Sequence, residues 1–204
     1  MKLYYSPGAC SLASHIALRE AELPFDLEKV DLKTKTTETG EDFRNINPRG
    51  YIPALRLDDG RVFTEGAHIL LWIGHQAPAD KKLLPAIGSD GYFAVVEYLV
   101  FIATELHKGC SPLFNPHTPE AARNAARDTL TMRVQWLNDT LGAKPYIDGN
   151  DFCVADAYLF TVLSWLPRLG FDYSRWPALE GYLARVGKRP NVLAALKAEG
   201  LVPA

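Results

Sequence analysis

Short apolar runs and amphipathic stretches alternate along the first part of the chain. Residues 3–5 and 25–30 form two such runs, and each predicts a strand. Between them, the apolar positions of residues 11–22 recur with the period of a helix. This order of elements is typical of a β-α-β unit.

The next stretch predicts a hairpin followed by a helix. Residues 54–57 are apolar apart from Arg56, residues 62–63 are apolar, and Asp59-Gly60 lies between the two runs. An Asp-Gly pair between two apolar runs is a good hairpin signal because glycine accepts the backbone angles of a tight turn. A helix is then predicted from Glu65 to about Gln76.

From Gly91 onward the pattern has helical periods and no strand signals. The predicted helices cover residues 92–108, 120–141, 154–166, 177–188 and 190–198. Residues 77–90 contain two prolines and several charged side chains, which is typical of a linker. We therefore expect an α/β domain over residues 1–80 and an all-helical domain over residues 87–204.

Composition and charge favour a small-molecule partner. With 204 residues, of which 48% are hydrophobic, the chain can bury a substantial core. A net charge of −2 argues against nucleic acid or an anionic membrane as the main partner. The longest apolar run, residues 92–103, is interrupted by Glu97 and is too short to span a bilayer. The N-terminus lacks a secretory pattern, so we expect a cytoplasmic protein.

The three cysteines, Cys10, Cys110 and Cys153, include no C-x-x-C pair. We therefore expect neither disulfides nor a metal site. Cys10 follows a strand and a Pro-Gly turn and stands at the start of a helix, where free N–H groups and the helix dipole favour a thiolate. A cysteine in this position is a plausible redox or conjugating centre, whereas we assign Cys110 and Cys153 structural roles.

Five motifs in order along the chain carry a resemblance to a known family. They are PGACSLA at residues 7–13, NPRGYIPAL at 47–55, TEG at 64–66, ELHKG at 105–109 and ADAYLF at 155–160. Together they resemble the bacterial beta class of the cytosolic glutathione transferase superfamily. The resemblance implies an N-terminal thioredoxin-like domain, an all-α C-terminal domain and a twofold homodimer.

The resemblance implies several anchors for glutathione in the first domain. The Glu65 carboxylate would pair with the γ-glutamyl ammonium, and the backbone N–H groups of Glu65 and Gly66 would receive the γ-glutamyl carboxylate. A cis Ile52-Pro53 bond would let the Ile52 backbone pair with the cysteinyl part. Lys35 matches the position that meets the glycyl carboxylate. The alternatives are that Glu65 only caps its helix and that Lys35 is a solvated loop residue.

In the helical half, one stripe of a helix predicted to end at Gly109 carries Val100, Ala103, Thr104 and His107, spaced i, i+3, i+4 and i+7. A lone histidine at a helix end is usually a cap or a surface residue.

By resemblance, however, His107 lies near the glutathione sulfur with Lys108 beside it, while Thr104 and Glu105 reach the site of the neighbouring subunit. Relatives often carry asparagine at the position of Val100. Because valine cannot make the amide's hydrogen bond, we expect glutathione binding weaker by about 0.5–1.5 kcal/mol.

The leading hypothesis is an enzyme that adds the sulfur of reduced glutathione to an apolar electrophile. In the beta class a cysteine stands where other classes use tyrosine or serine, so the resemblance also implies a mixed disulfide of Cys10 with glutathione. Ser11 is the alternative hydroxyl donor to the sulfur. A pathway-specific dehalogenase or isomerase, or a non-catalytic ligand-binding protein on the same fold, remain as alternatives.

Overall fold

The structure is a computed structural model that describes residues 1–203, and the chain forms two compact units. One unit combines residues 1–84 with residues 188–203, and the other covers residues 85–187.

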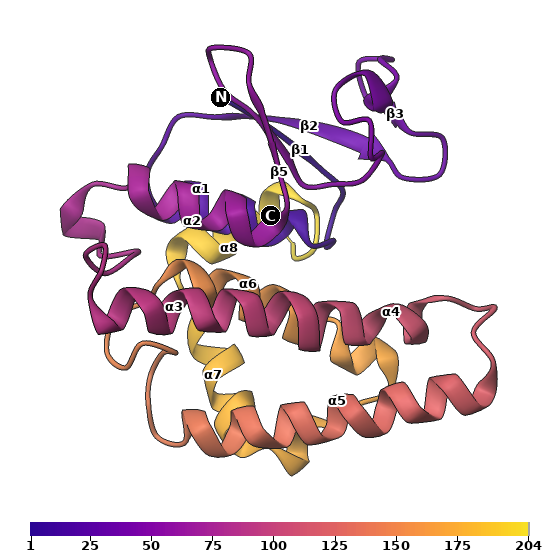
Figure 1. Cartoon of the computed structure of the whole chain (residues 1–204), viewed down its shortest axis with the longest axis vertical. Coiled ribbons are helices and arrows are strands. Elements are labelled where there is room, and N and C mark those ends of the chain that lie inside the picture. Colours follow the sequence, from indigo (N-terminus) through magenta and orange to yellow (C-terminus); the bar gives the residue numbers. More distant parts are fainter. Residues whose placement is uncertain (204) are drawn as a thin grey trace. The chain divides into compact units, whose positions relative to one another are not determined.

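The first unit is built on a mixed five-stranded sheet with strand order β3-β2-β1-β4-β5 (Figure 1). The strands are β1 (Lys2–Tyr5), β2 (Asp26–Asp31), β3 (Thr36–Thr37), β4 (Ala54–Arg56) and β5 (Val62–Thr64). Strand β1 is central, and it runs parallel to β2 and antiparallel to β4. The predicted hairpin is confirmed as β4 and β5, with Gly60 at a φ of 86° in the turn. The short strand β3 lies in a polar stretch for which the sequence analysis predicted no element.

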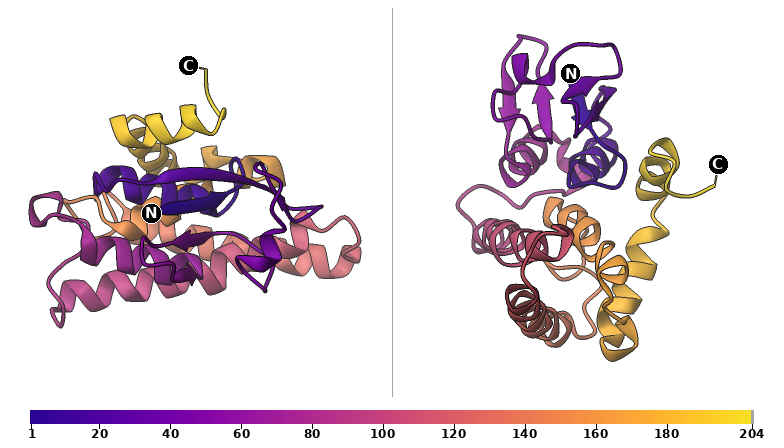
Figure 2. Two further views of the ribbon diagram at one scale, coloured as in Figure 1. Left: turned by 90° about the horizontal axis from the view of Figure 1, so that it is seen from above. Right: turned by 90° about the vertical axis from the view of Figure 1, so that its right-hand side faces the viewer.

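Two helices, α1 (Ser11–Glu20) and α2 (Gly66–Gln76), lie side by side on one face of this sheet (Figure 2). Nearly every residue of α1 is buried, including Leu12 and Ile16. Helix α1 is covered on several sides, because it contacts β1, α2 and the C-terminal helix α8 (Pro190–Ala198). The unit also contains two 3₁₀ turns, at Phe43–Asn45 and Ala79–Lys81.

The packing of α8 differs from the sequence-based division, which placed residues 87–204 in the helical domain. The Arg189 guanidinium, just before α8, donates from Nε to Glu20 Oε1 at 2.7 Å and from Nη2 to Glu20 Oε2 at 2.9 Å. Residues 188–203 therefore belong with the sheet-bearing unit. Helical periodicity predicted α8 correctly but does not say which neighbour covers its apolar face.

The second unit is all-helical within residues 85–187. Its elements are α3 (Asp90–Phe101), a π-helix η3 (Ile102–His107), α4 (Lys108–Phe114), α5 (Glu120–Leu141), α6 (Val154–Leu163) and α7 (Pro177–Gly187), with 3₁₀ turns at Leu166–Leu169 and Tyr173–Arg175. Every residue of α6 is buried, and α6 contacts α3, η3 and α7. No helix among residues 1–203 is long and apolar enough to cross a bilayer.

The helix predicted to end at Gly109 continues to Phe114, so that prediction is wrong. Gly109 was interpreted as a stop signal, but its role is steric. A Cβ at this position would lie 3.0 Å from Leu130 Cδ2, so the glycine allows α4 to approach α5 closely. The π-helix η3 also replaces α-helical spacing over residues 102–107, and π turns are frequent at functional sites.

Candidate functional site

Cys10 is the N-cap residue of α1 and is partly exposed. It follows β1 through a turn closed by the Ala9 N–H, which donates to Ser6 O at 3.0 Å. Gly8, in this turn, has a φ of 68°, a conformation that glycine adopts readily. The first-turn N–H groups of a helix lack intrahelical partners, so the thiol stands at the electropositive end of α1.

The Ile52-Pro53 peptide bond is cis, as the resemblance implies. The Cys10 thiol donates to the Ile52 carbonyl oxygen over 3.5 Å. The loop that carries the cis bond therefore lies beside the thiol.

The other two cysteines are buried and unsuited to chemistry. Burial raises the pKa of the Cys110 thiol to about 12. Burial, with the negative charge of Asp156 beside it, also raises the pKa of Cys153 well above its ordinary value. Cys10 is therefore the one thiol among residues 1–203 that both reaches the surface and stands at a helix start.

Ser11 does not face the surface. Its hydroxyl is buried, accepts from the Ser6 N–H at 3.2 Å and donates to Ser6 O at 3.4 Å. These bonds fasten α1 to the end of β1. The arrangement favours a structural role for Ser11 over the predicted alternative role as a donor to the glutathione sulfur.

A buried polar chain holds the turn before Cys10. Glu199, which follows α8, accepts from the Gly8 N–H at 2.8 Å and lies 2.8 Å from His15 Nδ1. The Arg19 Nε–H donates to His15 Nε2 at 2.8 Å, so Nε2 carries no proton and Nδ1 donates to Glu199. The Glu199 side chain lies fully buried in this chain of hydrogen bonds.

Replacement of Glu199 by alanine is expected to destabilise the protein by about 2–4 kcal/mol, because the buried His15 Nδ1–H and the partly buried Gly8 N–H lose the carboxylate that accepts from them. The midpoint of urea unfolding measures the effect. Glu22→Gln is the matched control, since Glu22 pairs with Lys81 at an exposed site, and it is expected to change stability by less than about 1 kcal/mol. Equal effects of the two substitutions would contradict a clamping role for Glu199.

Glu65 lies at the N-cap position of α2 with a φ of 67°, outside the usual range for a residue other than glycine. Its side chain makes no capping hydrogen bond, so the alternative that Glu65 only caps its helix is not supported. The carboxylate instead accepts from Arg49 Nη1 at 2.8 Å and from the Tyr51 hydroxyl at 3.2 Å. Gly66 begins α2, so its N–H is one of the unpaired groups of the first turn.

Lys35 also has a positive φ, at 60°. Its backbone N–H donates to Asp31 O, and its carbonyl accepts from the Phe43 N–H, both at 2.8 Å. The side-chain carbons lie near Gly50, two residues before Ile52. The structure thus brings Lys35 close to the loop that carries the cis bond, which suits the predicted role toward a carboxylate.

In the helical unit, His107 lies in an aromatic cluster. Its Nδ1 is 2.8 Å from the Tyr158 hydroxyl, and its ring centroid is 5.1 Å from that of Trp165 in a T-shaped arrangement. Phe114 packs against the other side of the cluster, with its centroid 5.7 Å from Trp165. Phe114 is half exposed, so the cluster offers an aromatic surface next to His107.

The other site residues predicted in this unit lie on the same continuous helical segment, formed by α3, η3 and α4. The Thr104 hydroxyl donates to the Val100 carbonyl at 3.0 Å, and Val100 is exposed. The Glu105 carboxylate accepts from Arg133 Nε at 2.8 Å. Lys108 is exposed at the start of α4.

Sequence reasoning missed three contacts of the site. Arg49 and Tyr51 stand within the quoted NPRGYIPAL motif but received no role, because their partner Glu65 lies 16 and 14 residues away. Tyr158 stands within the quoted ADAYLF motif and also received no role, although a hydroxyl on a fully buried helix signals a need for a partner. Among residues 1–203, no group of three His, Cys, Asp or Glu side chains could hold a metal ion.

A thiol at a helix start beside a cis-proline loop, with an acidic residue opening the next helix, defines a thioredoxin-like, thiol-handling protein with an added helical unit. Two family models match the chain. The one described as glutathione S-transferase, N-terminal domain, matches residues 8–76, and the one described as glutathione S-transferase, C-terminal domain, matches residues 101–190. The chain belongs to the glutathione S-transferase family.

Similar proteins point to one class within this family. Glutathione S-transferase GstA of Escherichia coli O157:H7 is 45% identical over 98% of this chain and 100% of the relative. A sphingomonad glutathione S-transferase solved in complex with glutathione and a beta-class enzyme from Sphingomonas chungbukensis are each 46% identical, with a TM-score of 0.94 over 99% of this chain and 100% of theirs. The predicted resemblance to the bacterial beta class is confirmed.

Proposed function

We propose that the protein is a glutathione S-transferase that conjugates reduced glutathione to apolar electrophiles. In the reaction, the glutathione thiolate attacks an electrophilic carbon, a C–S bond forms, and a leaving group departs with its electron pair. The observation that carries the proposal is the placement of Cys10 at the start of α1, in hydrogen-bond contact with the loop of the cis Ile52-Pro53 bond. The complex of a similar sphingomonad enzyme with glutathione supports it.

Each part of glutathione has a proposed binding partner among the predicted residues of the first unit. The Ile52 backbone would pair with the cysteinyl part, Lys35 with the glycyl carboxylate and Glu65 with the γ-glutamyl ammonium. The free N–H groups of Glu65 and Gly66 would receive the γ-glutamyl carboxylate at the positive end of α2. The sulfur of a tripeptide held in this way points to Cys10.

We also propose thiol-disulfide exchange at Cys10. The Cys10 thiolate would attack the disulfide of oxidised glutathione, form a mixed disulfide and release one glutathione thiolate. The burial of Cys110 and Cys153 supports a single site of exchange. Because an odd number of cysteines without a C-x-x-C pair suits a reducing compartment, we further propose that the protein acts in the cytoplasm.

His107 would act on the sulfur or on the electrophile, with Lys108 beside it supplying positive charge. The aromatic cluster of His107, Trp165 and Phe114 would form one wall of the electrophile site. Thr104 and Glu105 would reach the glutathione site of a second subunit.

A comparison of four proteins tests this function: the wild type, Cys10→Ala, His107→Ala and the matched control His117→Ala, whose histidine is exposed in the loop before α5. Glutathione-dependent turnover is measured on a panel of apolar electrophiles. We expect turnover in the wild type and the control, a loss of about 100-fold or more on removal of His107 if it acts in general acid-base catalysis, and an altered rate in Cys10→Ala. Absence of both glutathione binding and turnover in the wild type would instead indicate a ligand-binding protein on this fold.

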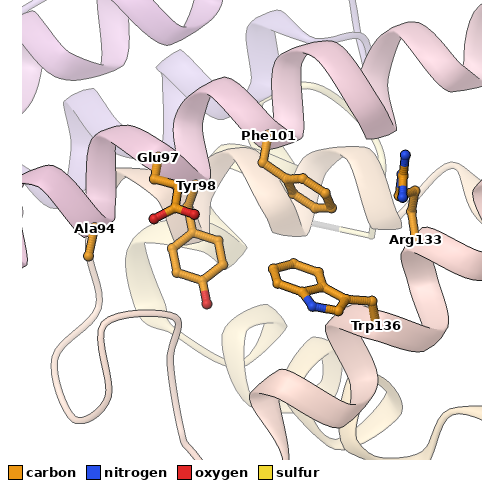
Figure 3. Close-up of a pocket in the computed structure, with 6 residues that line it drawn as sticks. All are labelled: Ala94, Glu97, Tyr98, Phe101, Arg133 and Trp136. Atoms are coloured by element: carbon orange, nitrogen blue, oxygen red, sulfur yellow. The ribbon is translucent and has the colours of Figure 1, made fainter.

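We propose a homodimer as the active form, on the basis of an apolar surface on α3 and α5. Phe93, Val100, Met132 and Trp136 are large hydrophobic side chains with 46–61% of their surface exposed. Beside them is a pocket of about 400 Å³, which Figure 3 shows opening between α3 and α5. Its lining residues are Ala94, Glu97, Tyr98, Phe101, Arg133 and Trp136. A clustered apolar surface of this kind marks a protein contact.

The variant Trp136→Glu tests the dimer. Light scattering coupled to size exclusion is expected to give the mass of two chains for the wild type and of one chain for the variant, because a charge cannot be buried unpaired at the contact. Glutathione-dependent turnover should fall with the dimer. A monomeric wild type with full activity would contradict the proposal.

A further inference from the structure

Two side chains from one loop hold the Glu65 carboxylate. Arg49 Nη1 donates to Glu65 Oε1 at 2.8 Å, and the Tyr51 hydroxyl donates to the same oxygen at 3.2 Å. Among residues 1–203, no donor is hydrogen-bonded to Glu65 Oε2. The carboxylate is therefore fixed through one oxygen and leaves the other open to a ligand.

The loop that carries these donors is itself well anchored. Asn47 is buried, and its Nδ2 donates to Tyr51 O at 2.7 Å. Its Oδ1 accepts from the Arg49 N–H at 3.2 Å, and its carbonyl accepts from the Gly50 N–H at 2.8 Å. One buried amide side chain thus fixes the backbone on both sides of Gly50, whose φ of 68° closes the turn.

The contacts contribute little to the stability of the fold. The Arg49 and Glu65 side chains are 56% and 59% exposed, and exposed ion pairs are weak in water. An arginine and a tyrosine that converge on one oxygen of a strained residue at a ligand site call for another explanation. That explanation is orientation of the carboxylate.

We propose that Arg49 and Tyr51 are positioning residues, which fix the Glu65 carboxylate so that its Oε2 accepts from the ammonium of the γ-glutamyl group. The inference rests on the proposed function, in which Glu65 binds that ammonium. A free glutamate side chain loses rotamer freedom when it binds a ligand. Donors that hold the Glu65 side chain in place before the ligand binds reduce this loss of entropy. They therefore raise the affinity although they do not contact the ligand.

Two other roles for Arg49 would give different results. If Arg49 occupied the place of the ammonium, the two cations would compete for Glu65, and removal of the guanidinium would tighten glutathione binding. If Arg49 bound a carboxylate of glutathione directly, its removal would weaken every ligand with that carboxylate, whether or not the ligand carries an ammonium.

Calorimetric titration with two ligands separates these cases. The ligands are reduced glutathione and its derivative acetylated on the γ-glutamyl amine, which has no ammonium. We expect Arg49→Ala and Tyr51→Phe each to raise the dissociation constant of glutathione by about 3- to 10-fold, the scale of one ordered side chain. For the acetylated derivative, each substitution should change it by less than about 2-fold, because no ammonium is left for Glu65 to receive.

Two further variants serve as controls. Arg49→Lys keeps a cation and should restore part of the affinity for glutathione. Arg61→Ala removes an exposed arginine that pairs with Asp59, away from Glu65, and should bind both ligands like the wild type. Circular dichroism and thermal melting of each variant confirm that the fold is retained.

Unchanged or tighter glutathione binding in Arg49→Ala would overturn the inference, as would equal weakening toward both ligands. If the wild type binds glutathione, and Glu65→Gln weakens that binding while Arg49→Ala does not, only the inference about Arg49 fails. If the wild type does not bind glutathione at all, the proposed function fails, and the inference fails with it.

Discussion

Replacement of Glu65 by glutamine is expected to raise the KM for glutathione by about 10- to 150-fold, because a charge-assisted hydrogen bond to the γ-glutamyl ammonium becomes a neutral one. The substitution also leaves the Arg49 guanidinium without its carboxylate partner. Since binding is the affected step, the turnover number at saturating glutathione should change much less. Steady-state kinetics with glutathione as the varied substrate measure both constants.

The control for Glu65 is Glu41→Gln, which removes the charge of an exposed glutamate in the same unit. It should leave the KM for glutathione within about 2-fold of the wild type, as is usual for surface substitutions. A KM that stays within the same range in Glu65→Gln would show that Glu65 does not anchor the ligand.

Replacement of Asp156 by alanine is expected to reduce the free energy of unfolding by about 3–6 kcal/mol. The Asp156 carboxylate is fully buried at the start of α6 and accepts three hydrogen bonds: from the Ile147 N–H at 3.0 Å, from the Cys153 N–H at 2.9 Å and from the Tyr182 hydroxyl at 2.9 Å. Alanine would leave the N–H groups of Ile147 and Cys153 unpaired in the interior. The Tyr182 hydroxyl would keep only its longer contact, of 3.2 Å, with the backbone carbonyl oxygen of residue 156. Urea unfolding followed by circular dichroism measures the loss.

Burial raises the pKa of the Asp156 carboxyl, and the N–H donors of Cys153 and Ile147 oppose the rise. Asp156→Asn keeps one acceptor oxygen in place and is expected to lose about 1–3 kcal/mol of unfolding free energy, so its effect remains measurable if the alanine variant does not fold.

Cys153→Ser is the contrasting change, because serine is a favoured N-cap residue, and it should stabilise the protein by about 0.5 kcal/mol without loss of turnover. Destabilisation by Asp156→Ala of less than about 1 kcal/mol would contradict a folding role for this carboxylate.

The periodic part of the fold could be predicted from the sequence. The alternation of apolar and polar residues gave β1, β2, the hairpin of β4 and β5, and the helical character of residues 91–198. Hydrophobic periodicity and turn residues are local properties of the sequence, so they predict an element wherever one of its faces is buried. The α/β unit with an all-helical partner is accordingly confirmed.

Features that depend on tertiary contacts could not be predicted in this way. Gly109 has the sequence signature of a helix end, yet it serves the close approach of Leu130 from α5. The π-helix leaves no signature in apolar spacing, and the packing of α8 on α1 depends on the distant pair of Arg189 and Glu20. Sequence patterns do not report such pairings because the partners are far apart along the chain.

For the candidate site, the sequence identified the residues with distinctive chemistry, and the structure added residues that are hydrogen-bonded to them. Cys10, Glu65 and His107 stand out by residue type and motif. Arg49, Tyr51 and Tyr158 are ordinary residue types whose roles arise only from their hydrogen bonds to Glu65 and His107. A hydrogen bond between two loops has no period along a sequence, so it becomes visible only in three dimensions.

The central claim is that glutathione binds with its sulfur next to Cys10. Intact-mass analysis after treatment with oxidised glutathione tests it most directly, with peptide mapping to locate the modification. We expect one glutathionyl group per chain, attached at Cys10, removed by a thiol reductant and absent from Cys10→Ala. A protein that takes up no glutathionyl group, or one modified at Cys110 or Cys153 instead, would contradict it.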